Sequence, residues 1–395
     1  MESQKKIGCV VIMHPGQNNY GSSLQGYATI YKIEKLGYDY EIIRYIKKRS
    51  KKELFKNLPD LLKTGLIGQL KYRLNKKIDF LLYKDYKRTR AIRTKAVDNF
   101  KTKFLDSKSH FYKGFQELKE GSLNYSVVMV GSDQVWGPFS LYSKFYNLLF
   151  VDDSIPKFSY ASSFGVSNIV PCQKEAVANY LRRIDKIGVR EQRGKEIVKE
   201  LTGRDDAKVV LDPTFLLTRD EWEKNIDESR CKIGEPYILS YVLGERHDIR
   251  NVIKELGRKS GLKIVNLPHI DNYHSMDNNL GDINLYDVDP FDFIKLIRDA
   301  AYVVTDSFHG SVFSILFHKK FITFYRANPK KKGSTHSRID SLFNIFNIKD
   351  RIYSDDIYTH IQKSIDYDYV ERKLTVMRDD SLNFLKDCLA LSKHA

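Results

Sequence analysis

Short apolar runs that end in polar, glycine-containing turns alternate with helical patterns along most of this chain. The first apolar run, at residues 6–13, is followed by a polar loop and by a helical pattern that opens at Ser22 and ends at Gly37. A second apolar run follows at 40–45. A strand, a helix and a strand in this order form a βαβ unit with parallel strands. The alternation therefore predicts a parallel sheet covered by helices.

The alternation resumes further along the chain in two series. The first series predicts strands at 127–130, 158–162, 187–189 and 209–211. The second series runs from 237 to 325, and the segment that separates the two is rich in Asp, Glu, Gly and Pro, as a linker is. This is the pattern of an α/β protein with two Rossmann-like domains that face each other across a cleft.

We expect the first domain to span 1–228 and the second to span 236–345. Residues 346–395 hold further helical patterns, which we expect to pack back across both domains. Ligands of open α/β sheets bind beyond the carboxyl ends of the strands, so the turns after these strands are where a site is expected.

The excess positive charge is concentrated in one segment. The chain has 66 Lys+Arg and 50 Asp+Glu, a net charge of +16. Residues 44–119 hold 23 Lys+Arg and 7 Asp+Glu, so this segment alone accounts for +16 and the remainder is neutral. Residues 46–120 also interrupt the α/β alternation with leucines at four-residue spacing. We interpret 46–120 as a basic helical insertion in the first domain, an arrangement that argues against nucleic acid as a partner.

Composition excludes several other classes of protein. With 42% hydrophobic residues the chain is not disordered. Its four cysteines lie far apart without a CxxC pair, which argues against a disulfide framework and a structural zinc site. The apolar run at 7–13 is too short to span a bilayer and lacks a cleavage site, so we expect a cytoplasmic protein. No set of metal ligands stands out, and no metal is expected.

The most informative turn follows the predicted strand at 301–305. Here Ser307, His309, Gly310 and Ser311 lie between the end of a strand and the start of a helix. Free N–H groups near Gly310 and Ser311, with two serine hydroxyls, can face an anion, and His309 can exchange a proton beside it. The alternative is that Asp306 or Ser307 only caps the helix and that His309 is a surface residue.

Two further turns carry candidate residues after strands of the first domain. Asp133 follows the strand at 127–130, where it can orient a sugar hydroxyl, act as a base or cap a helix. Arg190 ends the strand at 187–189, where its guanidinium can bind a carboxylate or phosphate. A surface pair between Arg190 and Glu191 is the alternative for that residue.

The first loop is the matching site of the first domain. It contains Gly21, which permits close backbone approach, Ser22 as a helix cap, and Asn19, which can reach into the cleft. The loop lacks the GxGxxG glycines, so no dinucleotide fingerprint is present. Its candidate acceptor-binding residues are Asn18, Asn19, Tyr20, Gly21, Ser22 and Gln25.

Together these segments resemble the polysaccharide pyruvyl transferase family. Six stretches carry the resemblance and occur in the order of the family. They are 18–25 (NNYGSSLQ), 130–136 (VGSDQVW), 157–165 (KFSYASSFG), 188–191 (GVRE), 211–215 (LDPTF) and 304–314 (VTDSFHGSVFS). The resemblance runs to about residue 345, and nothing from it carries over to 46–120.

The resemblance implies a GT-B-like architecture with the active site between the domains. It implies transfer of the pyruvyl group of phosphoenolpyruvate onto two hydroxyls of a sugar, with formation of a cyclic ketal and release of phosphate. His309 and Ser307 would be the functional histidine and serine of the family, and Arg190 its anion-binding arginine. A family lysine falls within Lys330–Lys332; Lys330 is our candidate for the donor contact.

This chemistry suits the candidate residues. His309 would protonate the methylene carbon of the donor or assist departure of phosphate, while Arg190 and the 307–311 turn hold the anion. Asp133 or the 18–25 loop would position the acceptor. Phosphoenolpyruvate enters as a co-substrate, and no other cofactor is expected.

The acceptor implied is a saccharide of an exopolysaccharide or capsule, or its lipid-linked precursor. Because such precursors are assembled at the inner membrane face, the basic 46–120 segment is a candidate for peripheral contact with anionic lipid. The alternative is a solvated helical surface whose leucines face their own core. Two other functions remain open, a GT-B-like glycosyltransferase that uses a nucleotide sugar, and a non-catalytic polysaccharide- or membrane-binding protein.

Overall fold

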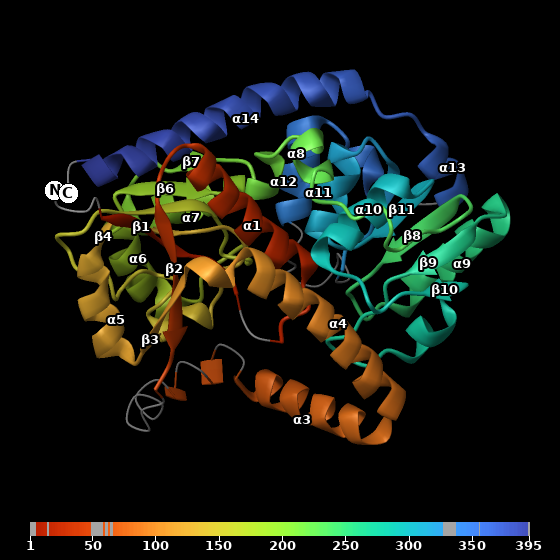
Figure 1. The fold of residues 1–395 in the computed structure, drawn as a ribbon, viewed down its shortest axis with the longest axis horizontal. Helices are drawn as coiled ribbons and strands as arrows, with labels where there is room; N and C mark the ends of the chain where they lie inside the picture. The colour runs from red at the N-terminus through yellow and green to blue at the C-terminus, as the bar shows by residue number, and fades with distance from the viewer. Residues whose placement is uncertain are drawn as a thin grey trace.

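The computed structural model describes residues 5–13, 16–48, 58–59, 62–63, 66–326, 337–354 and 356–393. Two sheets form its framework, one in each half of the chain (Figure 1). All the paired strands are parallel, because nearly every strand is joined to the next by a segment that contains a helix. The predicted class, an α/β protein with two parallel sheets, is confirmed.

The first sheet has seven strands in the order β3-β2-β1-β4-β5-β6-β7. Its central strand β4 is buried along its whole length, as expected for an apolar strand covered on both faces. The strands are β1 (Lys6–Val10), β2 (Tyr40–Ile46), β3 (Ser109–Lys113), β4 (Tyr125–Val130), β5 (Lys157–Ser162), β6 (Lys186–Val189) and β7 (Lys208–Val209).

The second sheet has five strands in the order β10-β9-β8-β11-β12. Its central strand β8 is likewise fully buried. The strands are β8 (Tyr237–Tyr241), β9 (Lys263–Asn266), β10 (Ile283–Asn284), β11 (Tyr302–Thr305) and β12 (Lys320–Thr323).

The helices lie between and around the two sheets (Figure 1). Those in the first half of the chain are α1 (Tyr20–Lys35), α3 (Leu66–Leu82), α4 (Lys84–Phe104), α5 (Phe115–Gly121), α6 (Lys174–Arg182), α7 (Gln192–Thr202) and α8 (Arg219–Glu223). Those in the second half are α9 (His247–Ser260), α10 (Pro290–Asp299), α11 (Phe308–Leu316), α12 (Ser337–Phe346), α13 (Ile357–Gln362) and α14 (Tyr367–Leu389).

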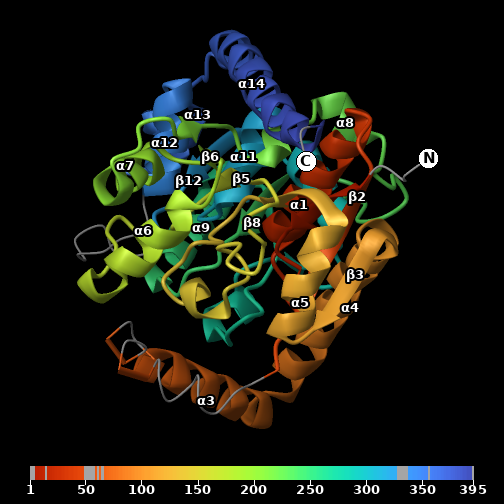
Figure 2. The same ribbon diagram turned by 90° about the vertical axis from the view of Figure 1, so that its left-hand side faces the viewer.

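The basic insertion is shorter than the sequence predicts. Helices α3 and α4 form it, and α3 stands apart from the body of the molecule (Figure 2). The expected range 46–120 also contains β3 and α5, which belong to the first domain, since β3 pairs with β2 at the edge of the sheet. Only one of the five residues of β3 is buried, so the strand has no apolar pattern by which it can be recognised.

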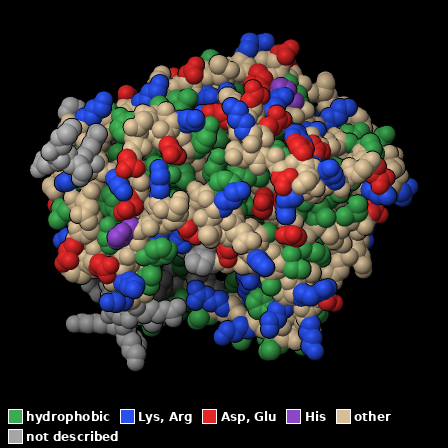
Figure 3. Space-filling model, in the orientation of Figure 1, with side chains coloured by type: hydrophobic (Ala, Val, Ile, Leu, Met, Phe, Trp, Pro, Cys, Tyr) green, Lys and Arg blue, Asp and Glu red, His purple; other side chains and the backbone are tan. Residues whose placement is uncertain are grey.

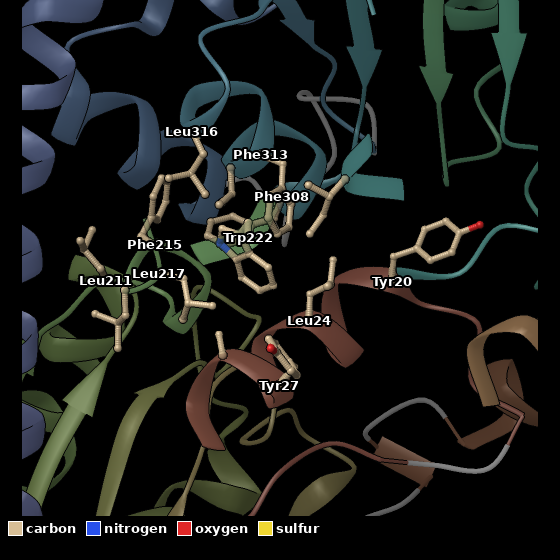
Figure 4. Close-up of a cluster of buried hydrophobic side chains, with 14 of the residues drawn as sticks. Tyr20, Leu24, Tyr27, Leu211, Phe215, Leu217, Trp222, Phe308, Phe313 and Leu316 are labelled. Carbon is tan, nitrogen blue, oxygen red and sulfur yellow. The ribbon is translucent and has the colours of Figure 1, made fainter. Parts of the chain in front are cut away.

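The two halves of the chain share one hydrophobic core. Leu24 and Tyr27 of α1 lie at this junction, close to Trp222 and to aromatic residues of α11, and Tyr20 lies further along the same helix (Figure 4). The ring of Tyr20 stacks on Phe293 of α10 with 4.7 Å between centroids. Helix α1 of the first domain therefore packs directly against the second domain.

Helix α14 crosses from the second domain back to the first along one side of the molecule (Figure 1). On the way it contacts the segment after β7: the Leu211 N–H donates to the Ser381 hydroxyl at 3.0 Å, and Arg378 donates to the Phe215 carbonyl at 2.7 Å. Among the described residues, no helix combines the length and the apolar character needed to span a bilayer.

Candidate active site

The carboxyl ends of strands from both sheets converge on one cluster of charged side chains. Asp133 follows β4, Arg190 follows β6 and Asp212 follows β7 in the first domain. His309, the second residue of α11, follows β11 in the second domain. This is the edge at which ligands of parallel α/β sheets bind, and both domains contribute to it.

Arg190 is at the centre of this cluster. Its Nη1 donates to Oδ2 of Asp212 at 3.0 Å, and its Nη2 lies 3.7 Å from Oδ1 of Asp133. Both Arg190 and Glu191 are buried, so the alternative of a surface pair is wrong. Nε and Nη2 of Arg190 are buried and make no hydrogen bond among the described residues, but they lie 3.9 Å from Oε2 of Glu191 and 3.7 Å from Oδ1 of Asp133.

Asp212 links the arginine to the histidine. Its Oδ2 accepts from the hydroxyl of Ser132 at 2.8 Å and lies 3.6 Å from Nε2 of His309. Burial alone would raise the pKa of Asp212, but the neighbouring His309 and Arg190 hold it well below its ordinary value. Asp212 is a functional candidate that the sequence reasoning did not assign, although it lies in the quoted stretch 211–215.

His309 is held where the two domains touch. A Cβ added to Gly21 of α1 would lie 2.0 Å from Nδ1 of His309, so only glycine permits this contact. Nε2 has no hydrogen-bond partner among the described residues, since 3.6 Å to Asp212 is too long for one. His309 is buried, which contradicts the alternative that it is a surface residue.

Asp133 lies on the opposite side of Arg190 and is bonded to α1. Its backbone is in the left-handed region with φ of 78°, and its Oδ2 accepts from the hydroxyl of Ser22 at 2.7 Å. Burial would raise its pKa, but Arg190 and His309 lower it below the ordinary value. An ionised Asp133 is better suited to orienting a hydroxyl than to acting as a base at neutral pH.

Two further arginines lie beside the histidine turn. Phe308 has its ring centroid 4.4 Å from the Arg190 guanidinium carbon, and it lines a small pocket together with Arg326 and Arg338. Burial and the nearby Arg190 lower the pKa of Arg338 to about 10. Three guanidinium groups are thus gathered around one turn, with the carboxylate of Asp306 3.7 Å from Nε of Arg326. Several guanidinium groups at one turn can bind a multiply charged anion.

Comparison with known proteins identifies the family. A sequence model of the family described as polysaccharide pyruvyl transferase matches residues 19–329, more than half of the chain. The chain belongs to the polysaccharide pyruvyl transferase family. It is therefore a transferase, while no curated protein matches its sequence.

Solved structures share the fold of this pyruvyl transferase. The UDP-GlcNAc 2-epimerase of Neisseria meningitidis bound to UDP-GlcNAc aligns with a TM-score of 0.53 at 11% identity, over 97% of this chain and 99% of that one. The UDP-GlcNAc 2-epimerase of Methanocaldococcus jannaschii gives 0.51 at 10% identity, over 95% and 93%. The N-terminal domain of Candida albicans trehalose-6-phosphate phosphatase gives 0.51 at 11% identity, over 99% and 98%. Sequence identities of 10–11% are too low to transfer a function to this chain. The structural alignments confirm the GT-B-like fold.

The histidine turn of this pyruvyl transferase differs from expectation in its hydrogen bonds. The Gly310 N–H donates to the Ser307 hydroxyl at 3.3 Å and the Ser311 N–H donates to the Ser307 carbonyl at 3.0 Å, so neither is free for an anion. The Ser311 hydroxyl is bonded to Ser307 and Thr323. The first-turn donors without a partner among the described residues are the N–H groups of Phe308 and His309.

Ser307 and Gly310 therefore have defined structural roles. Ser307 is the N-cap of α11, which agrees with the capping alternative, while Asp306 accepts from the Leu243 and Gly244 N–H groups and so ties two loops together. A Cβ on Gly310 would lie 2.6 Å from Oγ1 of Thr305, so glycine is needed for α11 to pack on β11. Lys330–Lys332 lie outside the described residues.

The residues of the 18–25 loop are mostly engaged within the protein. Asn19, not Ser22, caps α1, accepting from the Ser22 N–H at 3.3 Å, so the predicted helix start was wrong by two residues. Asn18 bonds Asp271 and Thr94, and Gln25 donates to the Ser22 carbonyl while fully buried. Contact of these residues with an acceptor stays a prediction.

A larger pocket lies between the two domains. It has a volume of about 390 Å³ and is formed where α4 faces the loop after β9. Tyr83, Tyr86, Tyr273 and Tyr286 line it, with Asp85 and Asn278 among the polar groups. Aromatic faces beside carboxylate and amide groups are suited to a polar ring such as a sugar.

Proposed function

We propose that this chain transfers the pyruvyl group of phosphoenolpyruvate to two hydroxyls of a sugar, forming a cyclic ketal and releasing phosphate. The proposal rests on family membership and on one observation. This is the meeting of the His309 imidazole with Asp212 and with guanidinium groups at a single inter-domain turn. An imidazole beside a strong anion site is what protonation of an enol phosphate requires.

The donor complements the charges of the site. Phosphoenolpyruvate carries a carboxylate and a phosphate, and we assign the binding of these groups to the guanidinium groups of Arg190, Arg326 and Arg338 beside the histidine turn. The free first-turn N–H groups of α11 add donors to the same anion. Lys330 is proposed as a further contact.

The proton transfers are assigned to His309. Addition of a proton to the methylene carbon forms a C–H bond and leaves an oxocarbenium-like carbon, which the first sugar hydroxyl attacks with loss of its proton. The C–O bond to phosphate then breaks, and the second hydroxyl attacks the same carbon and closes the ketal. Its proton leaves with the phosphate, while the proton of the first hydroxyl returns to His309. Asp212 stabilises positive charge on the imidazole, and such acid–base catalysis contributes about 10²–10⁴-fold.

We further propose that the acceptor is a saccharide of a cell-surface polysaccharide or of its lipid-linked precursor. Asp133, bonded to Ser22, is placed to orient an acceptor hydroxyl. We assign the tyrosine-lined pocket to the sugar units next to the reacting one. An enzyme that acts on a lipid-linked saccharide works at a membrane surface without having to span it.

A thermal-shift titration with phosphoenolpyruvate tests the donor. At 100 times its Kd a ligand stabilises by about 2.7 kcal/mol, and we expect a rise in Tm of several degrees. Arg338→Gln should abolish most of the shift, because one of the anion-binding guanidinium groups is lost. Arg372→Gln on the exposed side of α14 is the matched control and should leave the shift unchanged.

The same titration with UDP-GlcNAc separates the proposal from nucleotide-sugar glycosyl transfer. A shift with UDP-GlcNAc and none with phosphoenolpyruvate would overturn it. His309→Ala should keep the phosphoenolpyruvate shift and lose phosphate release in the presence of acceptor. Retention of phosphate release by this variant would contradict the role of His309. A phosphoenolpyruvate shift without phosphate release in the parent protein would favour a binding protein without this chemistry.

A further inference from the structure

Helix α3 exposes a row of large apolar side chains. Ile67, Leu70, Leu74 and Leu81 are between 54% and 79% exposed. Their spacing of three, four and seven residues places them on one face of the helix. A continuous exposed apolar face is unusual for a monomeric soluble protein and marks a site of interaction.

The opposite face of α3 is turned toward the rest of the protein. Tyr72, Lys76 and Asp79 of α3 line a pocket with residues of the second domain, and Phe80 stacks on Tyr86 of α4 at 5.4 Å. These residues lie about half a turn around the helix from the apolar row. The apolar row therefore points away from the body, where α3 stands apart (Figure 2).

The charges beside the apolar row select its partner. Lys71, Arg73 and Lys77 are exposed on α3, and Asp79 is its one acidic residue. Figure 3 shows Lys and Arg side chains mixed with hydrophobic ones along the lower edge of the molecule, where α3 lies in Figure 1. A second copy of the chain would bring like charges together, whereas an anionic lipid surface complements them.

We propose that α3 lies in the plane of an anionic membrane surface, with its apolar row inserted between lipids and its Lys and Arg side chains at the headgroups. A basic amphipathic helix of this kind binds by apolar burial together with electrostatic attraction. The interaction needs no membrane-spanning segment. The proposal limits the membrane contact expected for the basic segment 46–120 to one face of α3.

The position of α3 fits a lipid-linked acceptor, and this part of the inference rests on the proposed function. Tyr83 follows α3 directly, stacks on Tyr273 with 3.7 Å between centroids and lines the tyrosine pocket. A sugar whose lipid is embedded beside α3 would reach this pocket without leaving the membrane surface.

Sedimentation with vesicles tests the inference. The protein should bind vesicles of phosphatidylcholine and phosphatidylglycerol, bind pure phosphatidylcholine much more weakly, and be released as salt is raised. The triple variant Leu70→Ser, Leu74→Ser, Leu81→Ser should weaken the partition by at least about a hundredfold. Lys71→Glu with Lys77→Glu should abolish the preference for anionic vesicles.

The matched control removes exposed apolar side chains elsewhere. Val376→Ser with Leu123→Ser changes residues that are 61% and 48% exposed, and should leave vesicle binding unchanged. All the altered side chains are exposed, so Tm and the phosphoenolpyruvate shift should stay those of the parent protein.

Equal binding by the triple variant and its parent, or no binding to anionic vesicles, would overturn the inference. A dimer in sedimentation velocity that the triple variant converts to a monomer would assign the face to a second copy instead. Absence of a phosphoenolpyruvate shift in the parent protein would refute the proposed donor. Vesicle binding by α3 would not be affected by that result.

Discussion

At the scale of single residues, the candidate site depends on buried charges that compensate one another. Arg190 is enclosed by Asp212, Asp133 and Glu191, and the hydroxyl of Ser163 donates to Glu191 at 2.6 Å. Burial raises the pKa of Glu191, whereas the pKa values of the two aspartates are lowered. Removing one partner of such a pair leaves an uncompensated charge in the interior.

Asp212→Asn should therefore destabilise the protein and abolish transfer. The loss is about 3–5 kcal/mol at neutral pH, because Arg190 keeps its charge and loses its 3.0 Å partner. A lowered folded-state pKa contributes stability that is present above the ordinary carboxyl pKa of about 3.9 and is lost as pH falls below it. The difference between variant and parent should thus be constant near neutrality and shrink below about pH 4.

Urea unfolding at a series of pH values measures this difference. Asp205→Asn, an exposed carboxylate after α7, is the control and should change stability by less than about 0.5 kcal/mol. If Asp212→Asn behaves like the control, the buried pair does not contribute as described.

At the scale of elements, the site depends on how closely α1 approaches α11. The two helices come from different domains and meet where Gly21 faces His309. Gly26 lies on the same helix five residues later, where an added Cβ would be 3.9 Å from the nearest atoms, those of Val11. Helix α1 thus has room for a methyl group at Gly26 but not at Gly21.

Gly21→Ala should lower the rate of pyruvyl transfer by about a hundredfold or more, because the methyl group displaces the imidazole. Gly26→Ala should keep full activity and gain about 0.5–1 kcal/mol of stability, as alanine favours a helix interior. Steady-state rates and thermal unfolding of both variants decide the matter. Equal activity of the two would show that the α1–α11 contact does not position His309.

At the scale of the whole molecule, the two domains share one core and should unfold together. Tyr20 from α1 is fully buried against Phe293 and Tyr241 of the second domain, and the guanidinium of Arg93 lies 5.2 Å from its ring centroid. Its hydroxyl has no hydrogen-bond partner among the described residues. The ring, not the hydroxyl, contributes its stabilisation.

Tyr20→Ala should destabilise the protein by about 3–5 kcal/mol, whereas Tyr20→Phe should be neutral or slightly stabilising. Differential scanning calorimetry of the parent should show one transition, which moves to lower temperature in Tyr20→Ala. Two separate transitions in the parent protein would contradict a shared core.

Local patterns in the sequence were enough to predict the α/β class, most strands, and the turns that hold Arg190 and His309. The strands of a parallel sheet are buried on both faces and therefore appear as continuous apolar runs, so the end of each run predicts the end of a strand. The edge strand β3 was not readable, since four of its five side chains are not buried. The sequence thus determined which turns lie at the carboxyl edges of the two sheets.

Only the tertiary structure decided which side chains at that edge hydrogen-bond or pack within the protein and which belong to the candidate site. Ser311 and Gly310 are used in packing α11, Asn19 caps α1, and Arg338 joins the site although no local pattern marks it. Asp212 follows a predicted strand, but only its contact with His309 shows that it belongs to the site. The same holds for α3, whose leucines fit either a buried or an exposed face. Hydrogen-bond partners and burial depend on contacts between residues far apart in the chain, and a local pattern carries no information about them.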